Sequence, residues 1–193
     1  MKLKIILGLL SLFMFIGNSE LVAQHHSKKH VHVVKKPHGR KTVVIKTHKR
    51  YARSKVIVVK RRNGKLHGIL PAGYSTIIYK NNSYHFHNGI YYLPKANAYV
   101  QVIPPMGLRI KTIPIHTSFT IGLINYHYYQ GVYYIMANNE YEIVDPPIGA
   151  KVADLPMDLV EEVTIDGITY WELDGYLYSK NANGTFDLAG KLE

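Results

Sequence analysis

The stretch Tyr126-His127-Tyr128-Tyr129-Gln130-Gly131-Val132-Tyr133-Tyr134 decides the fold, because its pattern Tyr-x4-Gly-x2-Tyr occurs three times in the chain. The same pattern begins at Tyr84 and at Tyr170, so its copies are separated by 42 and 44 residues. A fixed period of this length is typical of repeat proteins, in which each unit buries its apolar side only against its neighbours. We therefore expect a tandem-repeat domain.

A second motif supports the same period. The sequence Pro146-Pro147-Ile148-Gly149 is followed by Leu155-Pro156, and Pro104-Pro105-Met106-Gly107 is followed at the same spacing by Ile113-Pro114. A degenerate copy ends in Leu70-Pro71, with Arg61-Arg62 in place of the two prolines. We expect a repeat domain over residues 55–193, with units at about 70–112, 113–154 and 155–193.

The local pattern predicts an all-β fold. Short runs rich in Ile, Val, Tyr and Phe are separated by Asn, Gly, Pro and Lys, which is typical of strands joined by tight turns. Asn88-Gly89, Gln130-Gly131 and Asp174-Gly175 fit two-residue hairpin turns, and the Pro-Pro-x-Gly motif fits a corner outside the strands. We expect tandem β-hairpin repeats of about 42 residues that form small sheets or barrel-like units, with low helix content.

The hairpin turn assigns side chains to faces. A turn at Asn88-Gly89 pairs Phe86 with Tyr91 and His85 with Tyr92, so both faces of the hairpin carry aromatic residues. Either neighbouring units cover both faces, or one face presents its rings to a ligand. Under the second alternative the candidate ligand-binding residues are Tyr91, Tyr92, Tyr129, Tyr133, Tyr134 and Trp171.

The N-terminus reads as a secretory signal peptide over residues 1–24. Lys2 and Lys4 precede a short apolar run, and Leu21-Val22-Ala23 is a plausible cleavage site. The chain has no cysteine, so it offers neither disulfides nor a thiol for a lipid anchor. We expect export to the periplasm or the cell exterior, with no transmembrane anchor after cleavage.

Charge divides the chain. Between Leu21 and Asn139 there are nineteen Lys and Arg and no acid, whereas twelve acids face three lysines from Glu140 onward. We expect residues 25–54 to form a mostly flexible, basic, His-rich arm. Such asymmetry suits an anionic envelope polymer or lipid as partner, or attraction between the two halves within one chain or between copies; we do not expect nucleic acid.

The sequence offers candidate residues for metal binding and for catalysis. His85, His87 and His127 could converge on zinc or copper, although no nearby carboxylate orients them and polar positions on a half-exposed face are the simpler interpretation. No catalytic motif is present, and the acids of residues 161–174 read as a solvated face more simply than as a hydrolase pair. We expect a non-enzyme without a cofactor.

The chain resembles an uncharacterised family of secreted bacterial proteins with Tyr-rich units, a Gly-Val-Tyr-Tyr motif at Gly131 and a Pro-Pro-x-Gly…Leu-Pro motif at Pro146. The resemblance spans roughly residues 56–188 and implies no activity. Our leading hypothesis is a non-catalytic envelope protein that binds polysaccharide, peptidoglycan or an anionic surface through aromatic and basic residues. The alternative is a structural protein whose basic N-terminal and acidic C-terminal parts join copies.

Overall fold

The computed structural model describes residues 31–35, 41–45, 47–62 and 64–193, and the expected signal peptide lies outside them. The described chain is nearly all β, with one short 3-10 turn, η1 (Arg53–Lys55). The all-β prediction with low helix content is confirmed. No helix in these residues is long and apolar enough to cross a membrane.

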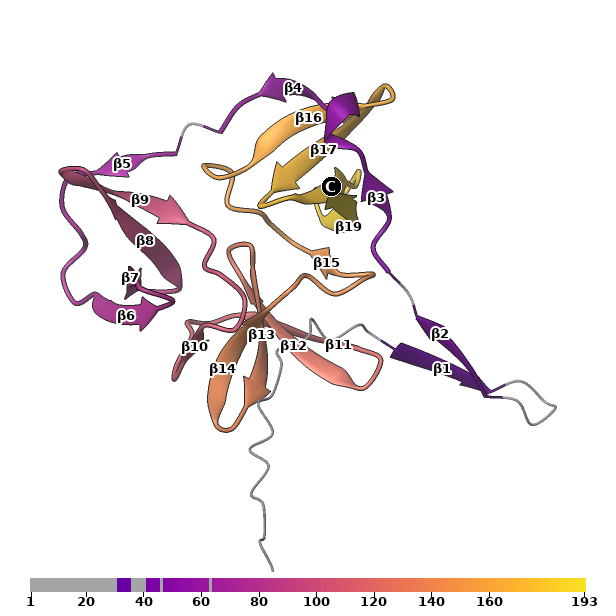
Figure 1. The fold of residues 1–193 in the computed structure, drawn as a ribbon, viewed down its shortest axis with the longest axis horizontal. Helices are drawn as coiled ribbons and strands as arrows, with labels where there is room; N and C mark the ends of the chain where they lie inside the picture. Colours follow the sequence, from indigo (N-terminus) through magenta and orange to yellow (C-terminus); the bar gives the residue numbers. More distant parts are fainter. Residues whose placement is uncertain (1–30, 36–40, 46, 63) are drawn as a thin grey trace, which may run out of the picture.

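Three successive sheets of the same design make up the body of the molecule (Figure 1). In each, four strands form an antiparallel meander, and a short strand that precedes the meander pairs with its last strand. Unit 1 contains β5 (Leu66–His67), β6 (Ser75–Tyr79), β7 (Asn82–His87), β8 (Ile90–Lys95) and β9 (Ala98–Val102). Unit 2 contains β10 (Arg109–Ile110), β11 (Thr117–Ile121), β12 (Ile124–Tyr129), β13 (Val132–Ala137) and β14 (Glu140–Val144). Unit 3 contains β15 (Lys151–Val152), β16 (Glu161–Ile165), β17 (Ile168–Leu173), β18 (Tyr176–Lys180) and β19 (Phe186–Leu192).

Each short strand lies just before the Leu-Pro or Ile-Pro step, so each sheet begins several residues before the unit limit expected from the sequence. The Pro-Pro-x-Gly corners connect one sheet to the next. The corner of unit 2 also adds backbone hydrogen bonds: Gly107 N donates to the Ile143 carbonyl at 2.8 Å, and Ile143 N donates to the Leu108 carbonyl at 2.9 Å. The corner therefore both redirects the chain and extends the sheet that follows it.

The central hairpin of each unit has the predicted register. In unit 1, His87 pairs with Ile90 and Phe86 with Tyr91, and the equivalent pairs recur in units 2 and 3. Asn88 and Gly89 have φ of 46° and 81°, as a type I′ turn requires. Gln130 adopts the same positive φ, 46°, although its side chain is less suited to that conformation than Asn or Gly. The glycine that follows it and the packing of the turn fix the geometry.

Each sheet has a front face and a back face, and the units stack through these faces. The front face carries His85, His87, Ile90, Tyr92 and their equivalents, and the back face carries Tyr84, Phe86, Tyr91, Leu93 and their equivalents. The back face of unit 1 packs on the front face of unit 2, where Tyr84 and Tyr91 meet Val132 and Tyr134. The back face of unit 2 packs in the same way on the front face of unit 3.

The last back face is covered by a segment from the start of the described body, which we call the cap. It comprises β3 (Arg50–Tyr51), η1 and β4 (Ile57–Lys60), and its Tyr51, Val56 and Val58 pack on the core of unit 3. β3 pairs in parallel with β19, and β4 pairs antiparallel with β16. In Figure 1 the cap runs over unit 3 and then leads into β5 of unit 1.

Ion pairs between the basic cap and the acidic unit 3 neutralise part of the charge asymmetry within the chain. Lys55 lies 3.5 Å from the Asp166 carboxylate, and Arg50 pairs with Glu193. These pairs are exposed, so each contributes at most about 1 kcal/mol. Their position nevertheless places the basic segment on the acidic unit.

The segment that we expect to be a mostly flexible arm contains two paired strands. β1 (Val31–Lys35) and β2 (Lys41–Ile45) pair antiparallel, which places both β-branched runs of the arm in a hairpin. β3 also lies before residue 55, where we expect the repeat domain to begin, whereas β4 lies after it.

Candidate functional site

Four of the six candidate ligand-binding residues are core residues. Tyr91, Tyr92, Tyr133 and Tyr134 are at most 4% exposed, whereas Tyr129 and Trp171 are half-buried. Tyr133 and Tyr134 are covered because unit 2 is stacked on both sides. An external polymer therefore cannot stack on these rings, and the alternative in which neighbouring units cover both faces describes unit 2.

The buried hydroxyls hydrogen-bond to one another or to the backbone. The Tyr91 and Tyr134 hydroxyls lie 3.3 Å apart across the interface between units 1 and 2. The Tyr128 hydroxyl donates to the Asp154 carbonyl at 2.5 Å and accepts from Gly131 N at 3.0 Å. Burial raises the pKa of Tyr91, Tyr134 and Tyr128 well above the usual range, so the phenols stay protonated. These tyrosines join the units.

The front face of unit 1 differs, because no other unit packs on it among the described residues. We call it the open face, and define it by Tyr74, Thr76, His85, Tyr92, Tyr99, Gln101 and His67. All but Tyr92 are half-buried or exposed, and Tyr74 is 44% exposed. Strands β5 to β9 therefore present one side to solvent that their equivalents in units 2 and 3 bury.

Comparison between units shows how this face is adapted to water. Gln101 stands where units 2 and 3 have Ile143 and Leu188, and His67 stands where they have Ile110 and Val152. The apolar residues that seal the joints are thus replaced by hydrogen-bonding ones, as expected of a terminal repeat. The tyrosines at positions 92 and 99 are retained.

The rings of the open face contact one another edge to face. The centroid of His85 lies 5.1 Å from that of Tyr74 and 5.3 Å from that of Tyr99, with interplanar angles of 87° and 85°. His67 packs against Tyr92 in the same manner at 5.2 Å. Thr76 Oγ1 and His85 Nδ1 are 3.0 Å apart, so the imidazole is also held by a hydrogen bond. This arrangement is a fixed aromatic platform with hydroxyl, amide and imidazole groups at its surface.

The three histidines of the metal hypothesis do not converge. His85 lies in the open face, and His87 contacts Asn88 at the hairpin turn of unit 1. His127 lies in unit 2, where its Nδ1 is 2.9 Å from His116 Nε2 and 2.9 Å from Ser118 Oγ. Within residues 47–62 and 64–193 no three His, Cys, Asp or Glu side chains gather closely enough to hold a metal. The three-histidine site is therefore absent.

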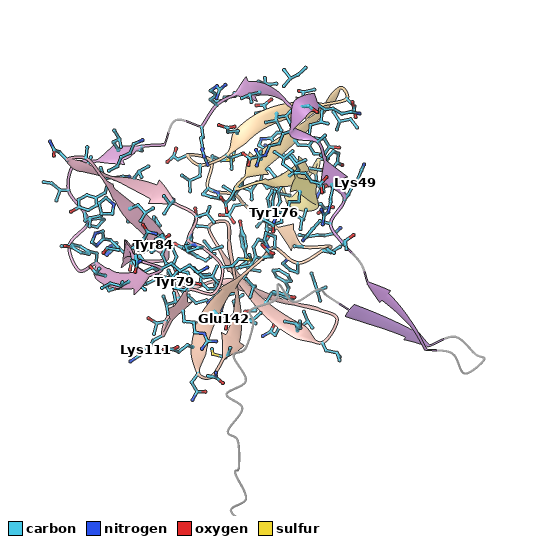
Figure 2. The ribbon with its side chains drawn as sticks, in the orientation of Figure 1. Lys49, Tyr79, Tyr84, Lys111, Glu142 and Tyr176 are labelled. Atoms are coloured by element: carbon cyan, nitrogen blue, oxygen red, sulfur yellow. The ribbon has the colours of Figure 1, made fainter. Side chains whose placement is uncertain are left out.

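A cleft of about 280 Å³ lies where units 2 and 3 meet, near Tyr176 in Figure 2. Lys191 Nζ donates to the Tyr176 hydroxyl at 2.9 Å, and that hydroxyl donates to Asp145. Burial raises the pKa of Asp174, which also lines the cleft. Because Lys191, Tyr176 and Asp145 bond to one another across the joint, we interpret them as a polar connection between the two units.

These cleft residues were missed by sequence reasoning. Asp145 occupies the position of Ile103, and Tyr176 that of Ile90 and Val132, so polar groups stand where the other units are apolar. A position-by-position comparison of the repeats would have found these polar residues, whereas a search for known motifs would not.

Glu172 is a buried acid of unit 3 that interacts electrostatically with Arg53 of the cap, and its titration gives a test of this part of the fold. Its side chain is buried, and burial is the main reason that its pKa is raised; Gly175 N donates to it at 2.5 Å, which opposes that rise. A raised pKa in the folded state means that stability falls as pH rises from about 4.5 through the raised value. We expect Glu172→Gln, which keeps an acceptor for Gly175, to flatten this fall.

Denaturant unfolding of both proteins at pH 4 and pH 7 measures the effect. The difference between variant and wild type should favour the variant more at pH 7 than at pH 4. A variant that instead loses stability as pH rises, as the wild type does, would show that another group titrates.

One protein family matches the sequence of this chain. The profile of a family of unknown function, DUF6515, matches residues 61–187, which extend from before β5 into β19. The chain belongs to the DUF6515 family. No curated protein matches the chain, and no solved structure does. The DUF6515 match covers the three meanders up to the start of β19 and leaves β3 and β4 of the cap outside it.

Proposed function

We propose that this DUF6515 protein is an exported, non-catalytic protein of the cell envelope that holds a saccharide polymer on the open face of unit 1. The observation that carries the proposal is the exchange of sealing apolar residues for Gln101 and His67 on a face where the Tyr74 ring is exposed and the Tyr99 ring is half-buried. Aromatic rings flanked by hydrogen-bonding side chains suit a ligand with both apolar ring faces and hydroxyl groups.

The charge of unit 1 extends the proposal to acidic polymers such as peptidoglycan or phosphate-bearing polysaccharide. Residues 64–108 contain Lys65, Lys80 and Lys95 and no Asp or Glu. A surface of one sign raises the local concentration of an oppositely charged polymer, and salt screens this effect. Ring contacts and direct hydrogen bonds depend much less on salt.

The alternative, copies joined by basic N-terminal and acidic C-terminal parts, is less favoured. Arg50 and Lys55 already pair with Glu193 and Asp166 of the same chain, and the cap covers the acidic unit. Joining copies through these groups would require the cap to leave its own unit 3. The polar substitutions on the open face also make it a poor seal against another sheet.

Retention on purified peptidoglycan and on lipopolysaccharide tests the proposal. We expect the wild type to be retained on at least one of them, and Tyr74→Ala combined with Tyr99→Ala to reduce affinity at least tenfold, about 1.4 kcal/mol. The matched control is Ile115→Ala combined with Leu123→Ala, since both side chains are almost fully exposed away from the open face. The control should bind as the wild type does.

Salt separates the two contributions. Retention that persists at 0.5 M salt indicates ring and hydroxyl recognition, and retention lost by then indicates charge alone. Equal loss in the ring variant and the control, or no retention of the wild type at low salt, would overturn the proposal. Sedimentation of the wild type at low ionic strength tests the alternative, which predicts growth of mass with concentration.

A further inference from the structure

His116 and His127 form an imidazole pair that the metal hypothesis from sequence did not contain. His116 Nε2 and His127 Nδ1 are 2.9 Å apart, and the ring planes are inclined by 78°. Both side chains are half-buried, between β12 and the segment that leads into β11. Tyr141 packs edge-on against both rings, with centroid distances of 5.9 Å and 5.2 Å.

The Pro114 carbonyl fixes the tautomer of the His116 ring. Its Nδ1 is 2.8 Å from the Pro114 carbonyl, which only accepts, so Nδ1 carries the hydrogen and donates. In the neutral ring the lone pair is then on Nε2, the atom that faces His127. A backbone carbonyl that holds the far nitrogen in this way is the usual support of a metal-binding histidine.

The environment also favours a neutral His127. Burial, together with the neighbouring His116, lowers the pKa of His127. Two neutral imidazole nitrogens 2.9 Å apart share one hydrogen, or both bind one cation that lies to one side of the line between them. His127 Nδ1 supplies the hydrogen in one tautomer, and in the other it offers a lone pair like that of His116.

This spacing is that of a hydrogen bond between the rings, and it also matches one coordination geometry. With metal–nitrogen bonds of about 2.0–2.1 Å, ligands at 90° lie about 2.9 Å apart, whereas tetrahedral ligands lie about 3.4 Å apart. Square-planar or tetragonal sites of nitrogen and oxygen are typical of Cu²⁺, which also binds such ligands most tightly among the common divalent metals. We propose that His116 Nε2 and His127 Nδ1 are adjacent ligands of a Cu²⁺ site whose remaining positions take solvent oxygen.

Unit 1 provides an internal comparison. His85 is the equivalent of His127, but Tyr74 occupies the place of His116, and Tyr99 occupies that of Tyr141. Thr76 contacts His85 as Ser118 contacts His127. The same frame therefore holds one imidazole in unit 1 and two in unit 2, and only unit 2 provides the pair.

The two units suggest exchange variants that the fold already accommodates. His116→Tyr copies unit 1 into unit 2, and Tyr74→His copies unit 2 into unit 1. The probe is Cu²⁺ added to the full chain labelled with ¹⁵N, because the paramagnetic ion broadens amide signals only near the site that it occupies. This local readout separates copper bound at the pair from any copper bound by the histidines of the arm, such as His25 and His26.

With less than one equivalent of Cu²⁺, we expect the wild type to lose signals around Ser118, His127 and Tyr141. His116→Tyr should bind there at least tenfold more weakly, and Tyr74→His should create a second broadened region around His85. Electron paramagnetic resonance should show two nitrogen ligands in the wild type. Broadening confined to the arm, or unchanged broadening around His127 in His116→Tyr, would overturn the proposal.

Discussion

Tyr134→Ala is expected to lower the free energy of unfolding by about 3–5 kcal/mol, the usual cost of removing a fully buried aromatic side chain. Tyr134 is 0% exposed and lies at the centre of the interface between units 1 and 2, in contact with the back face of unit 1. Its removal leaves a cavity in a joint that neither unit can close alone. Urea unfolding followed by circular dichroism measures the change.

Two further variants separate the ring from its hydroxyl. Tyr134→Phe keeps the ring but removes the partner of the Tyr91 hydroxyl, so we expect a loss of about 1 kcal/mol. Tyr74→Ala removes an exposed tyrosine and should change stability by about 0.5 kcal/mol or less. A loss below 1 kcal/mol in Tyr134→Ala would contradict the described stacking of units 1 and 2.

Gly89→Ala is expected to destabilise the fold by about 2–5 kcal/mol, the sum of a conformational and a steric cost. Gly89 has a φ of +81°, which L-residues with a Cβ adopt unfavourably, and a Cβ there would lie 2.4 Å from the Tyr129 ring and 2.9 Å from Pro114. Both neighbours belong to unit 2. The turn of unit 1 therefore touches unit 2 so closely that only glycine fits.

Gly167→Ala is the matched control, because Gly167 has a φ of +79° and a Cβ there would meet nothing within 4 Å. It should carry only the conformational cost, about 1–2 kcal/mol. The difference between the two variants then measures the closeness of the joint. If both lose the same stability, the joint yields without cost and the contact described at Gly89 does not restrict the fold.

The hairpins could be predicted from sequence because their determinants are local. The Gly at each turn and the alternation on either side fixed the pairs Phe86–Tyr91 and Tyr128–Tyr133, and both are observed. The repeat period likewise predicted the recurrence of the sheets. For the hairpins, residues within ten positions of one another contain the whole signal.

Other features depend on segments far apart in the chain and had no local signal. The short strand β5 pairs with β9 across more than thirty residues, and the cap pairs with unit 3 across more than a hundred. Which front face stays open follows from the stacking order, so sequence reasoning named Tyr133 and Tyr134 as ligand residues and missed Tyr74 and Tyr99. His116 escaped notice for the same reason, since its relation to His127 arises from the path of the chain before β11.

The cap has a consequence for how the molecule folds. β3 lies beside the last strand, with Lys191 N donating to the Lys49 carbonyl at 2.8 Å and Glu193 N to the Tyr51 carbonyl at 3.0 Å. Units 1 and 2 can assemble in the order of synthesis, but these contacts require the final residues of the chain. Contacts of such long sequence separation form slowly, because the entropy of loop closure must be overcome first. β4 of the cap can pair with β16 before then, whereas β3 pairs only after β19 has been made, so the covering of the third back face is completed last.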